Sequence, residues 1–351
     1  MAKKAVKKYF HFIVLVITLA AAIFTIVGLF GGNGNPASGN TARAMLTFAL
    51  PLLIILDLIL LVFWLCMRRW HWAVIPLIAV ICTIGYIRTI YFPGAGDPVS
   101  AKVGLKVATY NVASFGREAS SYIAQDILTE MKNQNVDVLC LQEYRERSGE
   151  QDNNAKYKSV FPYMVKSGSL AIFSRYPISK SQEIAFEQTN NGALYADIKA
   201  DNRELRIFNV HMQTTGINST LHQAGKLQKQ GKNVENSKIL KAIYGNYTLD
   251  LMVRSGQANI VANEVRQSTL PVILCGDFND VPYSYVYKTL KGNMKDGFTD
   301  CGSGWMKTYR GNKPVRIDYI FYDKSLNGIN YYKKDLTYSD HVPVFADIQV
   351  K

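Results

Sequence analysis

The sequence predicts an α/β domain with a substantially antiparallel sheet, preceded by three transmembrane helices. Composition changes sharply near residue 93, because the first 100 residues are mostly long apolar runs with only eight basic and two acidic residues. Beyond that point, short apolar runs typical of strands alternate with stretches typical of helices. Some neighbouring strand-like runs are joined by short turns, a connection available to antiparallel but not to parallel strands.

Three apolar stretches are each near the roughly 20 residues that a membrane-spanning helix requires. They cover Tyr9–Phe30, Ala44–Cys66 and Ala73–Phe92. The first exceeds a signal-peptide core and is followed by two more, so we expect it to be retained. Four lysines precede it, and Arg68 and Arg69 separate the second and third spans. Since basic residues favour the cytoplasmic side, we expect a multi-pass protein of a bacterial inner (plasma) membrane, with residue 93 onward in the periplasm.

The chain is therefore expected to have three parts: a membrane anchor over 1–92, a linker over 93–103 and one large domain over 104–351. The linker is rich in proline and glycine. Residues 101–351 hold 32 basic and 25 acidic residues, a net charge of +7. This excess favours anionic partners such as phosphate esters, nucleic acid or lipid headgroups, but it serves solubility equally well.

One acid, Asp57, lies in the middle of the second span, where a charge is costly unless it is paired or faces other helices. It is either a relay or sensing site, or an interhelical contact that fixes assembly, with Arg88 near the end of the third span as a candidate partner. The spans lack the other polar residues that a transport path needs, so we favour the contact.

Apolar runs bounded by turn residues predict eight strands in the large domain. They are Leu105–Tyr110, Val136–Leu141, Ser169–Phe173, Leu194–Lys199, Leu205–Val210, Val272–Cys275, Arg316–Phe321 and Val344–Val350. Helices are predicted over Ala119–Asn133 and from about Asn236 to Ser268, and a turn at Asp201-Asn202 joins two of the strands.

Residues 213–233 form a polar, glycine-containing segment that leads into the long helix. Between His222 and Lys241 the chain carries five lysines and a single acid, Glu235. This segment is either a solvated, mobile loop and helix face, or a surface that contacts substrate or membrane, since exposed basic clusters bind anionic surfaces. The first interpretation is the simpler one, and His222 receives no role.

The most informative stretch is Ile273-Leu-Cys-Gly-Asp-Phe-Asn279. It reads as a buried strand that places a carboxylate, Asp277, and a carboxamide, Asn279, at its C-terminal end. Gly276 lets the backbone leave the sheet without a Cβ in the way. Hard cations prefer oxygen ligands and retain waters, so these two side chains suit metal binding and the steering of a water molecule. Alone the motif is weak, because Asp and Asn also favour ordinary turns.

Other strand ends carry matching polar groups. They are Asn111, Glu143, His211, Asp318, Asp340 and His341. Each has a plain structural explanation by itself, but strand ends are rigid and can bring such groups to one rim. The large domain has only three histidines, and two of them belong to this set. Structural zinc spacing, a phosphate loop and a Gly-x-Ser-x-Gly elbow are all missing from the sequence, so oxygen-rich ligation favours Mg²⁺ or Mn²⁺.

Taken in order, these motifs resemble the endonuclease/exonuclease/phosphatase superfamily. The resemblance covers about residues 104–350 and rests on Thr-Tyr-Asn111, Leu-Gln-Glu143, Asn-Val-His211, Gly-Asp277-Phe-Asn279, Arg-Ile-Asp318-Tyr-Ile-Phe and Ser-Asp340-His341, with a further similar block at Ser169–Ile178. It implies a four-layer α/β/β/α sandwich, DNase I-like, with two mainly antiparallel central sheets and the site at their shared rim.

The resemblance also implies a divalent cation as cofactor, Mg²⁺ or else Mn²⁺. Glu143 would be its principal ligand, helped by Asn111 and Asp340. A metal ion and an imidazolium would together neutralise the charge that develops on the phosphorus in the transition state.

The remaining residues acquire catalytic and substrate-binding roles by the same resemblance. Asp277 and Asn279 would position the attacking water and the scissile phosphate. His341, oriented by Asp318, and His211 would serve phosphate binding and proton transfer. The general base is either Asp277 or a histidine.

The resulting hypothesis is a membrane-tethered, metal-dependent phosphoester hydrolase of the phosphodiesterase (nuclease) or phosphatase type. One alternative is a phosphodiesterase acting on phospholipid or sphingomyelin headgroups. An alternative of another class is a catalytically silent, membrane-bound binding module. Nucleic acid, phospholipid headgroups and small phosphoesters all stay open as substrates, and no protein partner is indicated.

Overall fold

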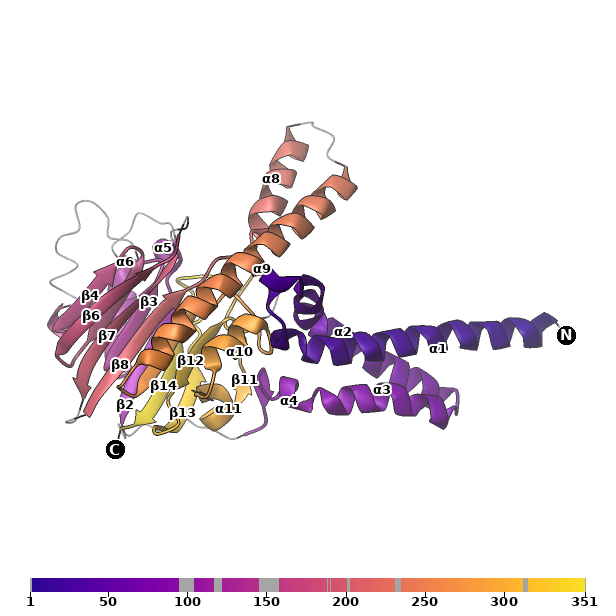
Figure 1. Cartoon of the computed structure of the whole chain (residues 1–351), viewed down its shortest axis with the longest axis horizontal. Coiled ribbons are helices and arrows are strands. Elements are labelled where there is room, and N and C mark those ends of the chain that lie inside the picture. The colour runs from indigo at the N-terminus through magenta and orange to yellow at the C-terminus, as the bar shows by residue number, and fades with distance from the viewer. Residues whose placement is uncertain are drawn as a thin grey trace.

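A bundle of helices and a two-sheet sandwich lie end to end in the computed structural model of this chain (Figure 1). The structure describes residues 2–94, 104–116, 122–144, 158–187, 189, 191–200, 203–230, 235–311 and 315–350. Most of the predicted linker and the predicted turn at Asp201-Asn202 lie outside these described residues.

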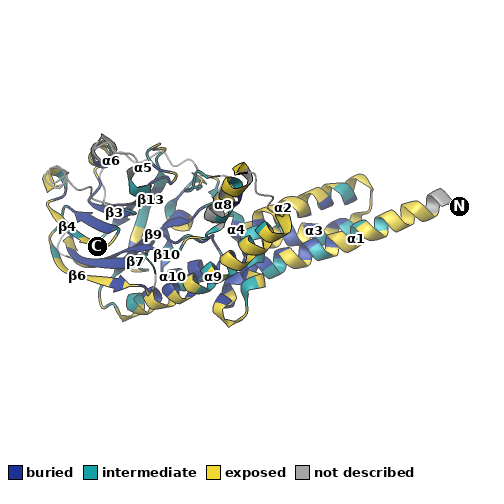
Figure 2. Cartoon of the chain, turned by 90° about the horizontal axis from the view of Figure 1, so that it is seen from above, coloured by how far each residue is buried: buried dark blue, intermediate teal, exposed yellow. Residues whose placement is uncertain are grey.

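The bundle consists of α1 (Ala2–Leu29), α2 (Thr41–Cys66), α3 (Trp70–Cys82) and the short α4 (Ile84–Ile87). Three helical stretches are long and apolar enough to cross a membrane, and the last runs from Trp70 to Ile87. Much of the bundle surface is exposed (Figure 2), and large apolar side chains lie on it, among them Ile23, Leu52, Ile59 and Ile78. Such a surface is stable when lipid covers it.

The end of the third predicted span is wrong. The helix stops at Ile87, and β1 (Tyr91–Phe92) pairs antiparallel with β11 (Gly304–Trp305). These two residues are apolar and continue the hydrophobic run, so the sequence alone assigns them to the span. A partner more than 200 positions away decides otherwise, because local propensity yields to tertiary pairing.

Asp57 is fully buried between helices of the bundle. Its Oδ2 accepts a hydrogen bond of 2.6 Å from Thr25 Oγ1 on α1. A second polar contact joins the same helices, since Trp64 Nε1 donates to Thr18 Oγ1 at 2.9 Å. Thr25, and not Arg88, is thus the partner of Asp57, and the contact supports the interpretation that this acid fixes helix assembly.

The domain contains two six-stranded sheets. The first has the order β10-β12-β9-β8-β7-β6 and the second β13-β14-β2-β3-β5-β4. Their strands are β2 (Leu105–Asn111), β3 (Val138–Gln142), β4 (Tyr163–Ser167), β5 (Leu170–Ser174), β6 (Ile178–Ala185), β7 (Gly192–Ala200), β8 (Arg203–His211), β9 (Val272–Asp277), β10 (Lys295–Asp296), β12 (Asp318–Tyr322), β13 (Asn327–Lys333) and β14 (Val344–Gln349). Among these strands only β2–β3 and β8–β9 pair in parallel.

Helices cover the outer faces of both sheets. The facing sides of the sheets share one core, which includes Val107, Ile172 and Ile207. Helix α6 (Tyr122–Asn133) buries apolar side chains on the outer face of the second sheet. Helices α9 (Asn236–Gln267) and α10 (Tyr285–Lys291) do the same on the first sheet. The result is the four-layer α/β/β/α sandwich that the sequence predicted.

Four edge strands were not predicted: β4, β6, β10 and β13. Each lies at the end of its sheet order, and most residues of β4 and β6 are exposed or only half-buried. An edge strand contacts one neighbouring strand and keeps polar side chains in water, so its apolar pattern is weak. The eight predicted strands lie further inside the sheets, where burial makes them nearly continuous apolar runs.

The segment predicted as a polar loop contains a helix, α8 (Ile217–Lys229). Together with the first part of α9 it forms a helical hairpin that projects from the sandwich (Figure 1). Helix α8 has one buried and one solvent-facing side: Ala224 is buried, whereas Lys226 and Lys229 are exposed.

The bundle is packed firmly onto the domain. Lys288 Nζ of α10 donates to Asn33 Oδ1 at 2.8 Å, and the rings of Tyr86 and Tyr283 meet edge to face at 5.6 Å. Further along, Arg316 Nη1 donates to the Thr89 carbonyl at 3.0 Å. These contacts join the bundle to the domain at separate points of the interface.

Candidate active site

Polar side chains from both sheets meet at one rim of the sandwich. Those from the second sheet are Asn111 at the end of β2, Glu143 after β3 and His341 before β14; those from the first are His211 ending β8, Asp277 ending β9 and Asp318 starting β12. Strand register explains the convergence, because Asp277 lies directly opposite both His211 and Asp318 in the sheet. The structure therefore brings these predicted residues together.

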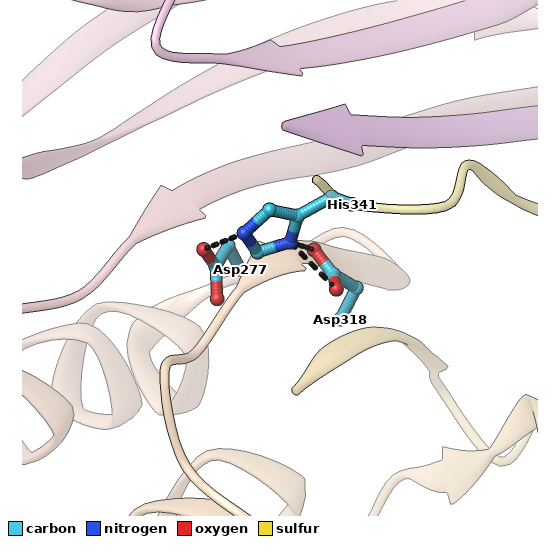
Figure 3. A group of neighbouring side chains, drawn as sticks. All are labelled: Asp277, Asp318 and His341. Atoms are coloured by element: carbon cyan, nitrogen blue, oxygen red, sulfur yellow. Dashed lines mark hydrogen bonds and ion pairs between the residues drawn. The ribbon is translucent and has the colours of Figure 1, made fainter. Parts of the chain in front are cut away.

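His341 lies between two carboxylates (Figure 3). Its Nδ1 is 3.0 Å from Asp318 Oδ2 and 3.1 Å from Oδ1, and its Nε2 is 3.6 Å from Asp277 Oδ2. The ring of Tyr309 packs edge-on against the imidazole at 5.1 Å. His341, Asp318 and Asp277 are all buried, so water screens the interactions between their charges little.

These carboxylates keep the imidazole of His341 charged. Burial alone lowers its pKa, but Asp318 and then Asp277 outweigh that effect and raise the pKa to about 10. Both ring nitrogens are then hydrogen-bond donors at neutral pH. Asp277, Asp318 and His341 lie close enough together to hold a metal ion. A protonated imidazole has no free lone pair for a metal, so a metal ion bound by this group would have to displace the proton from His341.

Asp277 accepts hydrogen bonds at both carboxylate oxygens. Oδ1 accepts from the Asn279 backbone N–H at 2.8 Å, and Oδ2 accepts from Asn111 Nδ2 at 3.0 Å. Burial raises the pKa of Asp277, although His341, His211 and Asn111 oppose this shift. Asn279 also donates to the Met212 carbonyl at 2.9 Å. Its φ of +51° places it in the left-handed region, a strained conformation often held at functional sites.

Glu143 is the accessible acid of the rim, with 35% of its side chain exposed. Its Oε1 is 3.3 Å from Asn111 Nδ2 and 3.8 Å from His211 Nε2. In the part of the chain that the structure describes, no lysine or arginine pairs with this carboxylate. A half-exposed carboxylate suits Mg²⁺. The Asn111 atom that faces Glu143 is the amide nitrogen, whereas Asn111 Oδ1 accepts from the Ala113 N–H at 3.0 Å. Glu143 also has a positive φ, +52°.

Asp340 is the third predicted metal ligand, beside Glu143 and Asn111. It is exposed, and within the described residues its carboxylate accepts one hydrogen bond, from Ser339 Oγ at 3.4 Å. The backbone carbonyl of Asp340 accepts from the Arg310 N–H at 2.7 Å. Its charge nevertheless contributes to the raised pKa of His341. Its role as a third metal ligand stays a prediction.

His211 is buried, yet neither of its ring nitrogens has a hydrogen-bond partner among the described residues. Burial lowers its pKa, against the opposing carboxylates of Asp277 and Glu143. Its Nε2 lies 3.8 Å from one oxygen of each of these acids. A buried polar group without a partner requires an explanation, and a phosphate oxygen or a water molecule bound at the rim would supply the missing partner.

Several residues that support the site were not singled out from the sequence. Gln142 Nε2 donates to Asn209 Oδ1 at 2.6 Å, which ties β3 of one sheet to β8 of the other. Ser339 Oγ donates to the Asn111 carbonyl at 2.7 Å and accepts from the His341 N–H at 3.1 Å. Gln142, Asn209 and Ser339 stand inside the motifs quoted above, and that position was the available signal.

Gly276 has a different function from the predicted one. Strand β9 continues through Asp277, so the backbone does not leave the sheet at Gly276. Its φ is +140°, and a Cβ there would lie 1.9 Å from the Val210 carbonyl oxygen. Glycine is needed because β8 and β9 approach closely, which sets His211 beside Asp277.

Replacing Asp318 with asparagine is expected to lower the pKa of His341 from about 10 towards its ordinary value of 6.5. The carboxylate that stabilises the imidazolium is lost, whereas the size of the side chain is kept. Titration of the His341 ring protons by NMR measures the change. A pKa that stays at its original value in Asp318→Asn would contradict the assigned pairing.

The fold and this rim together define a class, the DNase I-like proteins, in which two sheets bring acids, amides and imidazoles to one edge. Residues 108–341 match the model of the endonuclease/exonuclease/phosphatase family, and the chain belongs to that family. Residues 11–90 match a second model, described as a domain of unknown function. None of the curated proteins matches the chain.

Solved structures share this fold at low sequence identity. Truncated Caenorhabditis elegans TDP2 is 16% identical with a TM-score of 0.52, covering 70% of this chain and 97% of that one. An endonuclease/exonuclease/phosphatase from Bacteroides vulgatus is 15% identical with a TM-score of 0.50, covering 71% and 100%. Beta toxin from Staphylococcus aureus with bound magnesium ions is 18% identical with a TM-score of 0.49, covering 70% and 99%. At these identities the likeness concerns the fold alone.

Proposed function

We propose that this chain is a divalent-metal-dependent phosphoester hydrolase, anchored in a membrane with its hydrolase domain outside the cytoplasm. The observation that carries the proposal is the line of Asp318, His341 and Asp277 at the rim, with both nitrogens of His341 facing carboxylates. Family membership supports a phosphate ester as substrate. Nuclease or other phosphodiesterase activity and phosphatase activity all fit this site.

We assign the residues of the rim the following roles. His341, held charged by Asp318, donates from Nε2 to an oxygen of the phosphate and can deliver a proton to the leaving group. The carboxylate of Asp277 orients the attacking water. Asn279 and the unpartnered His211 bind the phosphate. These buried hydrogen-bond donors would stabilise the negative charge on the phosphate oxygens in the transition state.

Glu143 and Asn111 would hold Mg²⁺ or Mn²⁺, with Asp340 completing the set from the loop before β14. The bound cation would supply Lewis-acid stabilisation of the phosphate oxygens. The fit rests on the Glu143 carboxylate, which is accessible and has no basic partner in the described part of the chain. Such a carboxylate is free to bind a cation. Asn111 would bind the cation through Oδ1, which in this structure accepts from the Ala113 N–H.

A location outside the cytoplasm is supported by charge. The amino-terminal end of α1 and the α2–α3 connection lie at the end of the bundle away from the sandwich (Figure 1). That end carries Lys3, Lys4, Lys7, Lys8, Arg68 and Arg69, and the end near the sandwich carries Arg43 and Arg88. Because basic residues favour the cytoplasmic side, the sandwich belongs on the opposite side.

Hydrolysis of phospholipid or sphingomyelin headgroups is the second candidate. It is favoured by the contacts of the bundle with the domain, which keep the rim near the bilayer that the spans would cross. A catalytically silent binding module is the alternative of another class. The proposed acids and imidazoles are all present, which disfavours it.

The test is a substrate panel with the full chain in detergent and in nanodiscs, with Mg²⁺, Mn²⁺ or EDTA. The panel contains bis-p-nitrophenyl phosphate, plasmid DNA, RNA, sphingomyelin, phosphatidylinositol phosphates and soluble phosphomonoesters. We expect hydrolysis that EDTA abolishes and Mg²⁺ or Mn²⁺ restores. No turnover of any of these compounds with either metal would favour the silent module.

Glu143→Gln is expected to weaken metal binding by at least about 10–100-fold, since even the loss of a supporting group around a metal costs this much. Isothermal titration with Mn²⁺ measures binding independently of turnover, and the Mg²⁺ concentration for half-maximal hydrolysis should rise in parallel. Glu183→Gln is the matched control, because Glu183 is an exposed residue of the edge strand β6. Equal Mn²⁺ affinity in both variants would refute the assignment of Glu143.

A further inference from the structure

The helical hairpin of α8 and α9 carries a surface that the proposed hydrolysis does not use. We propose that its outer part, α8 together with Asn236–Tyr244 of α9, rests on the anionic lipid surface of the bilayer that the three spans cross. Leu240 and Tyr244 would enter the interfacial layer, and the lysines around them would meet lipid phosphates. The proposal is independent of which phosphate ester the rim hydrolyses.

The first argument is continuity with the membrane anchor. On α9, Tyr247 and Leu251 are buried against Ala44 and Phe48 of α2, and the Phe48 and Tyr247 rings lie 5.7 Å apart. These α2 residues belong to its first two turns, where the span of Thr41–Cys66 begins. α9 therefore touches the anchor at the level where α2 enters the bilayer.

The second argument is the face on which the exposed apolar residues lie. Leu240, Tyr244, Tyr247 and Leu251 are spaced by four, three and four residues, which places them along one stripe of the helix. Tyr247 and Leu251 are covered by α2, whereas Leu240 and Tyr244 are 65% and 55% exposed. The stripe thus continues beyond α2, with its outer part directed to the side on which the spans lie.

The third argument is the short distance along α9 between Leu240 and the contact with α2. Leu240 precedes Tyr247 by seven residues, about 10 Å along a helix at about 1.5 Å per residue. The interfacial region of a bilayer is several ångströms deep on each side. Because Tyr247 lies against the start of the span, Leu240 is within about 10 Å of that level along α9, whatever the tilt of the helix.

Charge identifies the surface that this part of the hairpin fits. Four exposed lysines, Lys226, Lys229, Lys238 and Lys241, flank the apolar positions, and Glu235 is the single acid among the described residues from 221 to 244. Exposed Leu221 and Leu227 add apolar area on α8. Lysines beside leucine and an aromatic residue are the composition of helices that lie in the plane of an anionic membrane surface.

The test is spin labelling of the full chain in nanodiscs of equal phosphatidylcholine and phosphatidylglycerol. The label is attached through Leu240→Cys or, as matched control, through Leu249→Cys. Leu249 is 57% exposed and lies on the opposite face of α9 from Leu240. Cys66, Cys82 and Cys301 are first replaced by alanine, so that the label does not react with them. Cys140 and Cys275 are kept, because they are buried. Relaxation by oxygen, which concentrates in lipid, is compared with relaxation by a water-soluble nickel chelate.

We expect the oxygen-to-nickel ratio to be several-fold higher at residue 240 than at residue 249. Changing Lys226, Lys229, Lys238 and Lys241 to glutamine, or omitting phosphatidylglycerol, should reduce that difference. The same ratio at both positions in the anionic nanodisc would overturn the proposal. So would spin–spin broadening at residue 240 that disappears on dilution with unlabelled protein, because it would identify a second copy of the chain as the occupant.

Discussion

Asp277→Asn is expected to reduce phosphoester hydrolysis by about 10³-fold, within the range that a positioned acid or base contributes. Asp277 is 1% exposed, and its oxygens accept from Asn111, from the Asn279 backbone and from the Asn279 side chain. Asparagine has the same shape but presents an NH₂ group to donors and removes the charge that faces His341. Water orientation and the pairing with the imidazolium are lost together.

The measurement is kcat/KM for bis-p-nitrophenyl phosphate, with circular dichroism and Mn²⁺ titration on the same preparations. Asp323→Asn is the control, because Asp323 follows the other end of β12. Its Oδ1 accepts from the Ser325 N–H, and this is its one side-chain hydrogen bond among the described residues. An amide oxygen can accept the same bond. We expect the control to retain full activity. Asp277→Asn protein that is folded, binds metal and keeps more than a tenth of wild-type activity would remove Asp277 from the reaction.

Asp296→Ala is expected to destabilise the domain by about 3–5 kcal/mol, the usual effect of removing one partner of a buried ion pair. Asp296 and Arg316 are both fully buried as side chains, and two contacts of 2.6 and 2.8 Å join them. The same guanidinium donates to the Thr89 carbonyl at the end of the anchor, and Tyr287 Oη donates to Asp296 at 2.8 Å. Without the Asp296 carboxylate, the charged guanidinium of Arg316 remains in the core without its ionic partner.

For a domain of this size the change corresponds to a fall in Tm of about 6–20 °C, measured by thermal unfolding of the full chain in detergent. The double variant Asp296→Ala/Arg316→Met should unfold at a higher temperature than Asp296→Ala, because it removes the unpaired charge. Glu235→Ala serves as the surface control: its pair with Lys238 is largely exposed, and we expect less than about 1 kcal/mol. Similar losses for Asp296→Ala and Glu235→Ala would mean that the buried pair does not stabilise the domain.

Polar residues at strand ends could be identified from the sequence because each follows a recognisable apolar run. The structure places Asn111, Glu143, His211, Asp277 and His341 within one connected group. Sequence order could not say which of them touch, because contact depends on how strands pair and on how two sheets face each other. The register that sets Asp277 opposite Asp318 is a property of the sheet and not of either strand.

Supporting groups were harder to find than the groups at the rim. Gln142 and Asn209 are polar residues within otherwise apolar strands, and only their meeting across two sheets gives them a purpose. Ser339 likewise matters because its hydroxyl joins the Asn111 carbonyl to the His341 N–H. Asp340, although next to His341 in sequence, is exposed at the surface. Residues 339 and 340 form a bend, so the direction of the Asp340 side chain could not be inferred from its neighbour in sequence.

By itself the sequence determined the three apolar helices, the inner strands of both sheets and the chemical types of the groups at the rim. These features follow from local composition, since lipid and a buried core both select long or regularly spaced apolar residues. Only the tertiary structure decided the edge strands, the end of the third span at Ile87, the helix α8 and the position of His341 between two carboxylates. Those features depend on partners distant in the chain, and a local pattern carries no information about a partner's position.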